Sequence, residues 1–136
     1  MSTDGKRWAG PPTADDFASI GQAQLDALPA PFRELVRDVP IRVQDYPDET
    51  TLDDLGIADP LDLTGLYHGV PVGLRESRPF ATGTDLIFLY RLPILVEWAE
   101  TGVDLEHLVR HVLIHEIGHH FGLSDEAMAA IEADEV

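Results

Sequence analysis

The sequence has no cysteine. This absence excludes disulfide frameworks, thiolate zinc sites, iron–sulfur clusters and cysteine nucleophiles. Any bound metal must therefore be held by histidine, aspartate, glutamate, backbone oxygens or water.

Long apolar runs are missing as well. The most apolar stretches, Leu86–Leu89 and Ile94–Val96, are far too short to span a bilayer. The charged N-terminus, Met1–Trp8, is not followed by the apolar segment that a secretory signal requires. We therefore expect a cytoplasmic protein without a membrane partner.

Basic residues are scarce: 9 lysines and arginines stand against 25 aspartates and glutamates, which gives a formal net charge of −16. A surface of this sign repels phosphate backbones, so we expect no nucleic-acid partner. The simplest role of the charge is solubility, and it attracts cations and basic peptides only in a general way.

The residues that are present indicate one folded domain. The chain has 136 residues, 44% of them hydrophobic, which is enough to bury a core without cross-links. Residues 1–12 combine glycine and proline with little periodicity. We therefore expect a flexible arm there and a single domain over residues 13–136.

Hydrophobic periodicity and capping residues predict the elements of this domain. A helix is expected from its N-cap Thr13 to about Leu28, and Pro29 and Pro31 separate it from a short helical turn near Phe32. Three strands are expected at Val39–Gln44, Leu66–Val72 and Asp85–Arg91, and three further helices at Pro93–Thr101, Leu105–Phe121 and Asp125–Ala133.

The order of these elements indicates an α+β fold with a small mixed sheet of about three strands. Pro71 suggests that the second strand lies at a sheet edge, because proline cannot donate to a ladder. The apolar third strand suits the centre. The acidic connector from Asp45 to Asp62 is predicted to be a solvated loop, with a wall of negative potential beside a substrate groove as the alternative.

Five of the six histidines lie between His107 and His120. Within this stretch, the run H-E-I-G-H that begins at His115 has the H-E-x-x-H pattern. Positions four apart share one helix face, so the imidazoles of His115 and His119 can bind one ion. Glu116 projects about 100° away and can reach a water on that ion, where a general base must lie.

The motif continues beyond the second histidine as HEIGHHFGLSD. Gly122 stands where the helix must end and the backbone turn back, which needs a residue that tolerates positive φ. Asp125 is then returned toward the metal as a third ligand. Two imidazoles, a carboxylate and a water form the open tetrahedral site of a catalytic zinc, so we predict one Zn²⁺ per chain at His115, His119 and Asp125. The alternative for Asp125 is stabilisation by the helix dipole without a metal.

The run HEIGHHFGLSD resembles that of the zincin-like metallopeptidases, in particular a group of compact bacterial members of this size. The resemblance extends to Gly65–Pro71 and Asp85–Arg91, about half of the chain. The motif looks like the glycine-turn metzincin pattern with Asp125 in place of the third histidine. The resemblance implies a pared-down zincin fold, because the eleven residues after Asp125 leave no room for the methionine turn of larger metzincins, and Met128 is too close to replace it.

The remaining candidates are less specific. His111 is expected to lie beside the site or in the core, because a fourth protein ligand would close the site to catalysis. His120 is expected to be a surface or packing residue. Tyr67, His68 and Tyr90 are candidates for contacting substrate at the strand edge or for stabilising the transition state, and the sequence does not choose among them. A surface role is the alternative for His68.

We therefore predict a zinc-dependent metallopeptidase in which Glu116 is the general base and the edge strand Leu66–Val72 binds an extended peptide or protein substrate. Its control is expected to depend on narrow specificity or on a regulatory protein partner. The main alternative is a metal- or peptide-binding module with little or no turnover. A metal-dependent ribonuclease is disfavoured by Glu116 and by the acidic charge, and an iron oxygenase with two histidines and one carboxylate does not need Glu116.

Overall fold

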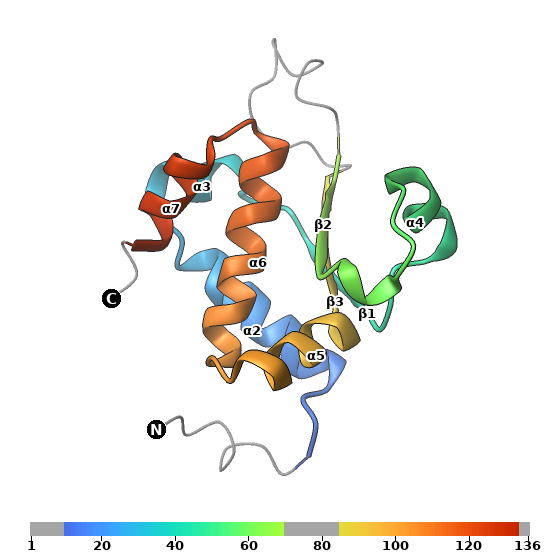
Figure 1. Ribbon diagram of the computed structural model, residues 1–136. Coiled ribbons are helices and arrows are strands. Elements are labelled where there is room, and N and C mark those ends of the chain that lie inside the picture. The colour runs from blue at the N-terminus through green and yellow to red at the C-terminus, as the bar shows by residue number, and fades with distance from the viewer. Residues whose placement is uncertain (1–9, 70–84, 134–136) are drawn as a thin grey trace.

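The structure is a computed structural model that describes residues 10–69 and 85–133. Within these ranges the chain forms six helices and a mixed three-stranded sheet (Figure 1), so the α+β prediction is confirmed. No helix in these ranges has the length and apolar character of a membrane span. The elements are α2 (Ala14–Asp26), α3 (Ala30–Leu35), β1 (Ile41–Gln44), α4 (Glu49–Leu55), the 3-10 turn η1 (Pro60–Asp62), β2 (Gly65–His68), β3 (Leu86–Tyr90), α5 (Arg91–Thr101), α6 (Leu105–His120) and α7 (Asp125–Ala133).

The strand order is β1-β3-β2, with β1 parallel and β2 antiparallel to β3. Among the described strands, β3 is central and β2 lies at an edge, as the sequence predicted. Strand β2 ends at His68, and the last residues of the second predicted strand, Val70–Val72, lie outside the described residues, as does most of the predicted arm. The division into an arm and one domain therefore stays a prediction.

Helices α2 and α6 lie on one side of the sheet, and α4 lies on the other (Figure 1). Helix α2 approaches the sheet closely at Gly21, where a Cβ atom would be 2.9 Å from Leu89 Cδ1. The space between the sheet and the two helices is filled by apolar side chains. Among those that are fully buried are Phe17, Ile87, Leu89, Leu113 and Ile117. This core holds α6, the helix with the histidines, against the sheet.

Side-chain caps begin α2 and α7 where the sequence predicted. The Asp16 N–H donates to Thr13 Oγ1 at 3.1 Å, and the Thr13 N–H donates to Asp16 Oδ2 at 2.8 Å, which forms a capping box. Pro29 is the N-cap of α3, so α2 and α3 are separate helices as predicted. At the start of α7, Ser124 Oγ accepts a hydrogen bond from the Ala127 N–H at 3.1 Å.

The prediction of a loop over Asp45–Asp62 is wrong, because this connector contains α4 and η1. Hydrogen bonds from the side chain and N–H of Thr51 to Asp48 cap α4 and lower the pKa of the Asp48 carboxyl group. Leu52 is buried, and Gly56 ends the helix with a φ of 68°. With a single buried residue, α4 has too weak an apolar periodicity to be recognised from sequence. Helix α4 lies on the side of the sheet opposite α6 (Figure 1).

Helix α6 ends in a tight turn that sends α7 back along it. Gly122 has a φ of 76°, and the N–H groups of Gly122 and Leu123 donate to the carbonyls of His119 and Gly118 at 3.2 and 2.8 Å. This is the Schellman motif expected of a glycine after a helix end. The two helices then meet at Gly118, where a Cβ atom would clash with the buried Met128 side chain. Met128 is therefore a packing residue of this helical hairpin.

Helix α6 also packs very closely on β2, and Gly65→Ala tests this contact. A Cβ atom at Gly65 would lie 2.6 Å from Val112 Cγ1 and 3.1 Å from the Phe88 carbonyl oxygen. Because β2 would have to move away from α6, we expect the free energy of unfolding to fall by about 1–3 kcal/mol, as measured by chemical denaturation. Gly10→Ala is the matched control, since no described atom lies within 4 Å of a Cβ atom there. Equal stability of Gly65→Ala and the wild type would contradict the close packing.

Candidate metal centre

Four histidines, His107, His111, His115 and His119, stand at intervals of four residues along α6, and we call the last three, whose rings neighbour one another, the histidine ladder. The ring centroids of His111 and His115 are 4.2 Å apart, and those of His115 and His119 are 5.8 Å apart. Each neighbouring pair has the spacing that lets two imidazoles bind one ion. The predicted pair, His115 and His119, is therefore one of two such pairs in the ladder.

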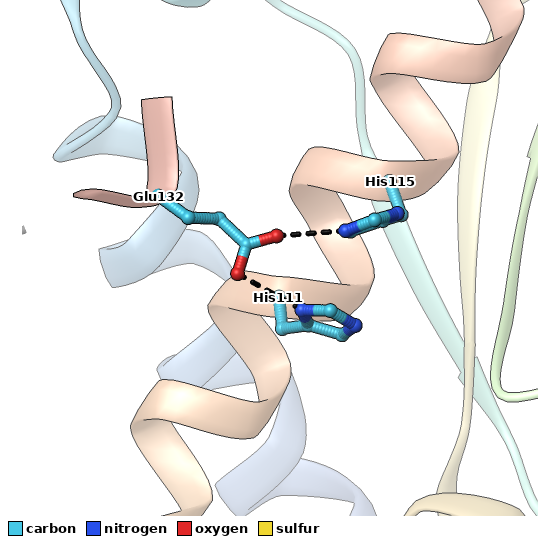
Figure 2. A group of neighbouring side chains, drawn as sticks. All are labelled: His111, His115 and Glu132. Atoms are coloured by element: carbon cyan, nitrogen blue, oxygen red, sulfur yellow. Dashed lines mark hydrogen bonds and ion pairs between the residues drawn. The ribbon is translucent and has the colours of Figure 1, made fainter. Parts of the chain in front are cut away.

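Glu132, near the end of α7, contacts two members of the ladder (Figure 2). Its Oε1 lies 2.7 Å from His115 Nε2, and its Oε2 lies 3.0 Å from His111 Nδ1. All three side chains are partly buried, with between 23% and 43% of their surface exposed. Two imidazoles from consecutive turns of α6 thus converge on one carboxylate of α7.

The charge on Glu132 decides which atoms carry the hydrogens. Burial raises the pKa of its carboxyl group, but the hydrogen bonds and charges of His111 and His115 together outweigh burial and lower the pKa below its usual value. The carboxylate is therefore ionised and can only accept hydrogen bonds. The two ring nitrogens that face Glu132 are the donors.

The predicted ligands occupy different positions around this contact. In the described ranges, one group of three histidine, aspartate or glutamate side chains has ligand atoms within 4.8 Å of one another, and it consists of His111, His115 and Glu132. It shares His115 with the predicted set. His119 and Asp125 are exposed and lie outside this group. Their assignment as ligands stays a prediction.

Glu116 lies on α6 one residue after His115 and contacts the edge strand. Its Cγ is 3.5 Å from where a Cβ atom of Gly65 would lie, and its carboxylate accepts a hydrogen bond from the backbone of Tyr67. Burial raises the pKa of Glu116 to about 7, although the hydrogen bond from Tyr67 lowers it. A carboxyl group with such a pKa exchanges protons readily near neutral pH, which suits a general base.

Tyr67 links the edge strand to its surroundings. Its hydroxyl donates to Asp85 Oδ2 at 2.6 Å, and Asp85 is buried. Its ring stacks on His120 with the two centroids 4.0 Å apart, so His120 packs against the strand, in line with the prediction of a surface or packing residue. The hydroxyl of Tyr67 is thus engaged within the protein.

The other two candidates at the strand edge differ in environment. His68 is exposed at the end of β2. Tyr90 is buried at the end of β3, and burial, together with the negative charges of Asp48 and Glu116, raises its pKa to about 12. Its hydroxyl therefore stays protonated at neutral pH and can donate a hydrogen bond.

Comparison with known protein families identifies the family of this chain. A family model described as zincin-like metallopeptidase matches residues 36–135, a range that includes all three strands, the histidine ladder, Glu116 and Glu132. The chain belongs to the zincin-like metallopeptidases. No curated protein matches the sequence significantly.

Membership of the zincin-like family implies metal-dependent, peptidase-like chemistry with zinc as the metal. The donor groups fit this ion, because imidazole nitrogens and carboxylate oxygens are both zinc ligands. The histidine ladder offers two adjacent imidazole pairs, and α7 carries an acidic residue at each of its ends, Asp125 and Glu132.

Glu132 and Asp85 are the residues that sequence reasoning missed. Glu132 follows Asp125 by seven residues, about two helical turns, so both share one face of α7. This spacing, beside the four-residue spacing of the histidine ladder, is the signal that points to Glu132. Asp85 has no comparable signal, because its partner Tyr67 lies 18 residues earlier on a different strand.

Tyr67→Phe tests the structural role of this hydroxyl. The substitution removes a hydrogen-bond donor from Asp85, which is 1% exposed. We therefore expect the free energy of unfolding to fall by about 1–3 kcal/mol in chemical denaturation. Tyr46→Phe, at a side chain that is 50% exposed, is the control and should change stability by less than about 0.5 kcal/mol. The same small effect in both variants would show that the Tyr67 hydroxyl does not support the strand.

Proposed function

We propose that this zincin-like protein is a zinc-dependent peptidase of the cytoplasm, with His115, His119 and Asp125 as metal ligands and Glu116 as general base. The observation that carries the proposal is the position of Glu116. It follows His115 directly on α6 and reaches the edge strand at Gly65 and Tyr67. A purely structural metal site has no use for an acid in this position.

The helical hairpin supports Asp125 as the third ligand. His119 lies in the last turn of α6, and Asp125 is the first residue of α7. The turn at Gly122, with its positive φ, joins these two helix ends. Because both side chains are exposed, an ion in solution can reach them.

The chemistry then divides between the metal and Glu116. When bound, zinc lowers the pKa of a water and polarises the carbonyl group of a peptide bond. Glu116 accepts the proton of the attacking water and returns it to the leaving amine. The hydrogen bond from the Tyr67 backbone holds the Glu116 carboxylate in one orientation.

We propose that the substrate is an extended peptide or protein segment that lies along β2. Within the described residues this strand pairs with β3 on one side, and its other edge can take part in strand addition. A peptide there would pass the site at which Glu116 meets the strand. His68 and Tyr90 are the side chains that remain to stabilise the transition state, since the Tyr67 hydroxyl donates to Asp85.

A metal- or peptide-binding module without turnover is the second candidate, and one observation favours it. His115 Nε2 lies 2.7 Å from Glu132, so this nitrogen is engaged outside the predicted ligand set. A module of this kind would bind zinc or peptide but would hydrolyse neither peptides nor proteins.

The variant Glu116→Gln tests whether Glu116 is the general base and not a metal ligand. Glutamine has nearly the same size as glutamate but cannot accept the proton, so we expect zinc content equal to the wild type and peptide hydrolysis at least about a hundredfold slower. His115→Ala should lose both zinc and hydrolysis. Elemental analysis measures the metal, and a library of fluorogenic peptides measures hydrolysis.

Glu126→Gln is the matched control, because Glu126 is an exposed acid in the first turn of α7. It should leave zinc content and hydrolysis unchanged. Hydrolysis by Glu116→Gln at the wild-type rate would contradict the assignment of the base. A zinc-loaded wild type that cleaves no peptide of the library would support the second candidate.

We further propose that the peptidase has narrow specificity or acts with a regulatory protein partner, because an unrestricted peptidase in the cytoplasm would damage other proteins. The purified protein alone should therefore leave casein largely intact, as followed by gel electrophoresis over several hours. Broad digestion of casein would show that neither restriction applies.

A further inference from the structure

We propose that His111, His115 and Glu132 form a second binding site for a divalent zinc ion, distinct from the proposed catalytic ligand set but sharing His115 with it. The existence of this site is independent of the peptidase function. Only the competition between the two sites rests on that function.

The ligands of the second site suit a zinc ion that has three protein ligands and one open coordination position. Two imidazole nitrogens and one carboxylate provide three ligands, and these atoms lie within 4.8 Å of one another (Figure 2). Bonds of about 2.0–2.2 Å to a tetrahedral ion place neighbouring ligand atoms about 3.3–3.5 Å apart. The contacts of Glu132 at 2.7 and 3.0 Å would have to open by about half an ångström to admit the ion, and the widest separation, at most 4.8 Å, would have to close by up to about 1.5 Å through side-chain rotation.

The backbone that carries Glu132 is already anchored on α6. Arg110 Nη2 donates a hydrogen bond to the Ile131 carbonyl oxygen at 3.2 Å, one residue before Glu132. The buried Met128 side chain packs against Gly118 on the same pair of helices. Because the hairpin is fixed at these points, metal binding would order few additional groups.

Charge and protonation also favour a cation at this position. Glu132 lies within hydrogen-bonding distance of both His111 and His115, and an imidazole that carries one hydrogen can carry it on either ring nitrogen. The nitrogen freed in this way offers its lone pair to the metal, and no further co-reactant is needed. The formal net charge of −16 lowers the cost of adding two positive charges.

An ion pair that merely fastens α7 to α6 is the alternative explanation of these contacts. A single cationic partner is sufficient for such a pair. Here two histidines from consecutive helix turns approach different oxygens of one carboxylate, at 2.7 and 3.0 Å. This convergence of three zinc-type donors favours the metal site.

The shared histidine makes the two sites mutually exclusive. A neutral imidazole has one ring nitrogen with a free lone pair, because the other nitrogen carries the hydrogen, so an ion that His115 binds with His111 and Glu132 removes this side chain from the set with His119 and Asp125. The protein would therefore bind a single zinc ion in either of two adjacent positions. Occupancy of the second position would inhibit a catalytic centre that needs His115.

The test uses the full chain with His119→Ala and Asp125→Ala combined, which removes the catalytic set but leaves the second site complete. After treatment with a chelator, this double variant should still bind about one zinc ion per chain in calorimetry and elemental analysis. Adding Glu132→Gln or His111→Ala to it should weaken zinc binding at least about tenfold. Glu126→Gln, at an exposed acid in the first turn of α7, is the matched control and should leave the affinity unchanged. Far-UV circular dichroism verifies that each variant is folded.

Absence of zinc binding in the double variant would overturn the second site, as would binding that Glu132→Gln does not weaken. Peptide hydrolysis by the wild type would in that case leave the proposed function standing. Glu132-dependent zinc binding in the double variant, beside a zinc-loaded Glu132→Gln variant of the otherwise wild-type chain that hydrolyses no peptide, would retain the second site and remove the catalytic one, because the second site cannot inhibit that variant. A lower melting temperature of Glu132→Gln with undiminished zinc affinity would assign the contact as an ion pair only and overturn the second site.

Discussion

The close packing of α6 on the edge strand is the constraint on which the metal centre depends. At Gly65 the strand lies so near the helix that a Cβ atom would collide with Val112. Val112 and Glu116 are one helical turn apart, so the same contact that seats Val112 also directs Glu116 onto the strand. The histidine ladder then lies on a different face of α6, where it meets α7. A rotation of α6 by one residue, about 100°, would separate Glu116 from β2 and the ladder from Glu132.

The second constraint is the length of the hairpin between α6 and α7. The turn at Gly122 fixes where α7 begins, and the contact between Gly118 and Met128 fixes how closely the helix returns. Asp125 and Glu132 lie on one face of α7, at opposite ends of that helix. The hairpin can therefore offer a carboxylate to either end of the histidine ladder, and the family resemblance by itself singles out only one of them.

Features that short stretches of sequence encode could be predicted. The capping box at Thr13, the start of α7 at Asp125 and the positive φ at Gly122 follow from residue types at fixed local spacings. The central place of β3 follows in the same way from its unbroken apolar run. The edge position of the strand before it was also correct, although Pro71, on which it was based, lies outside the described residues.

Features that depend on contacts between distant elements could not be predicted. The hydrogen bond from Tyr67 to Asp85 connects β2 to the residue just before β3, and the approach of Glu132 to His115 requires the path of the whole hairpin. Helix α4 was missed for a different reason, because its single buried residue, Leu52, gives no periodic pattern. The motif thus predicted which helix would carry the metal chemistry. It did not predict which carboxylate would meet the histidines.

The most direct measurement of the central claim is the position of zinc in crystals of the zinc-loaded wild-type protein, located by anomalous diffraction at the zinc absorption edge. A metal centre built on α6 predicts one strong peak about 2.0–2.2 Å from a ring nitrogen of His115, with a second ladder histidine and a carboxylate of α7 beside it. The identity of that carboxylate, Asp125 or Glu132, would show which of the two positions the ion prefers. A zinc-loaded crystal with no peak at His115 would contradict the assignment of α6 as the metal-binding helix.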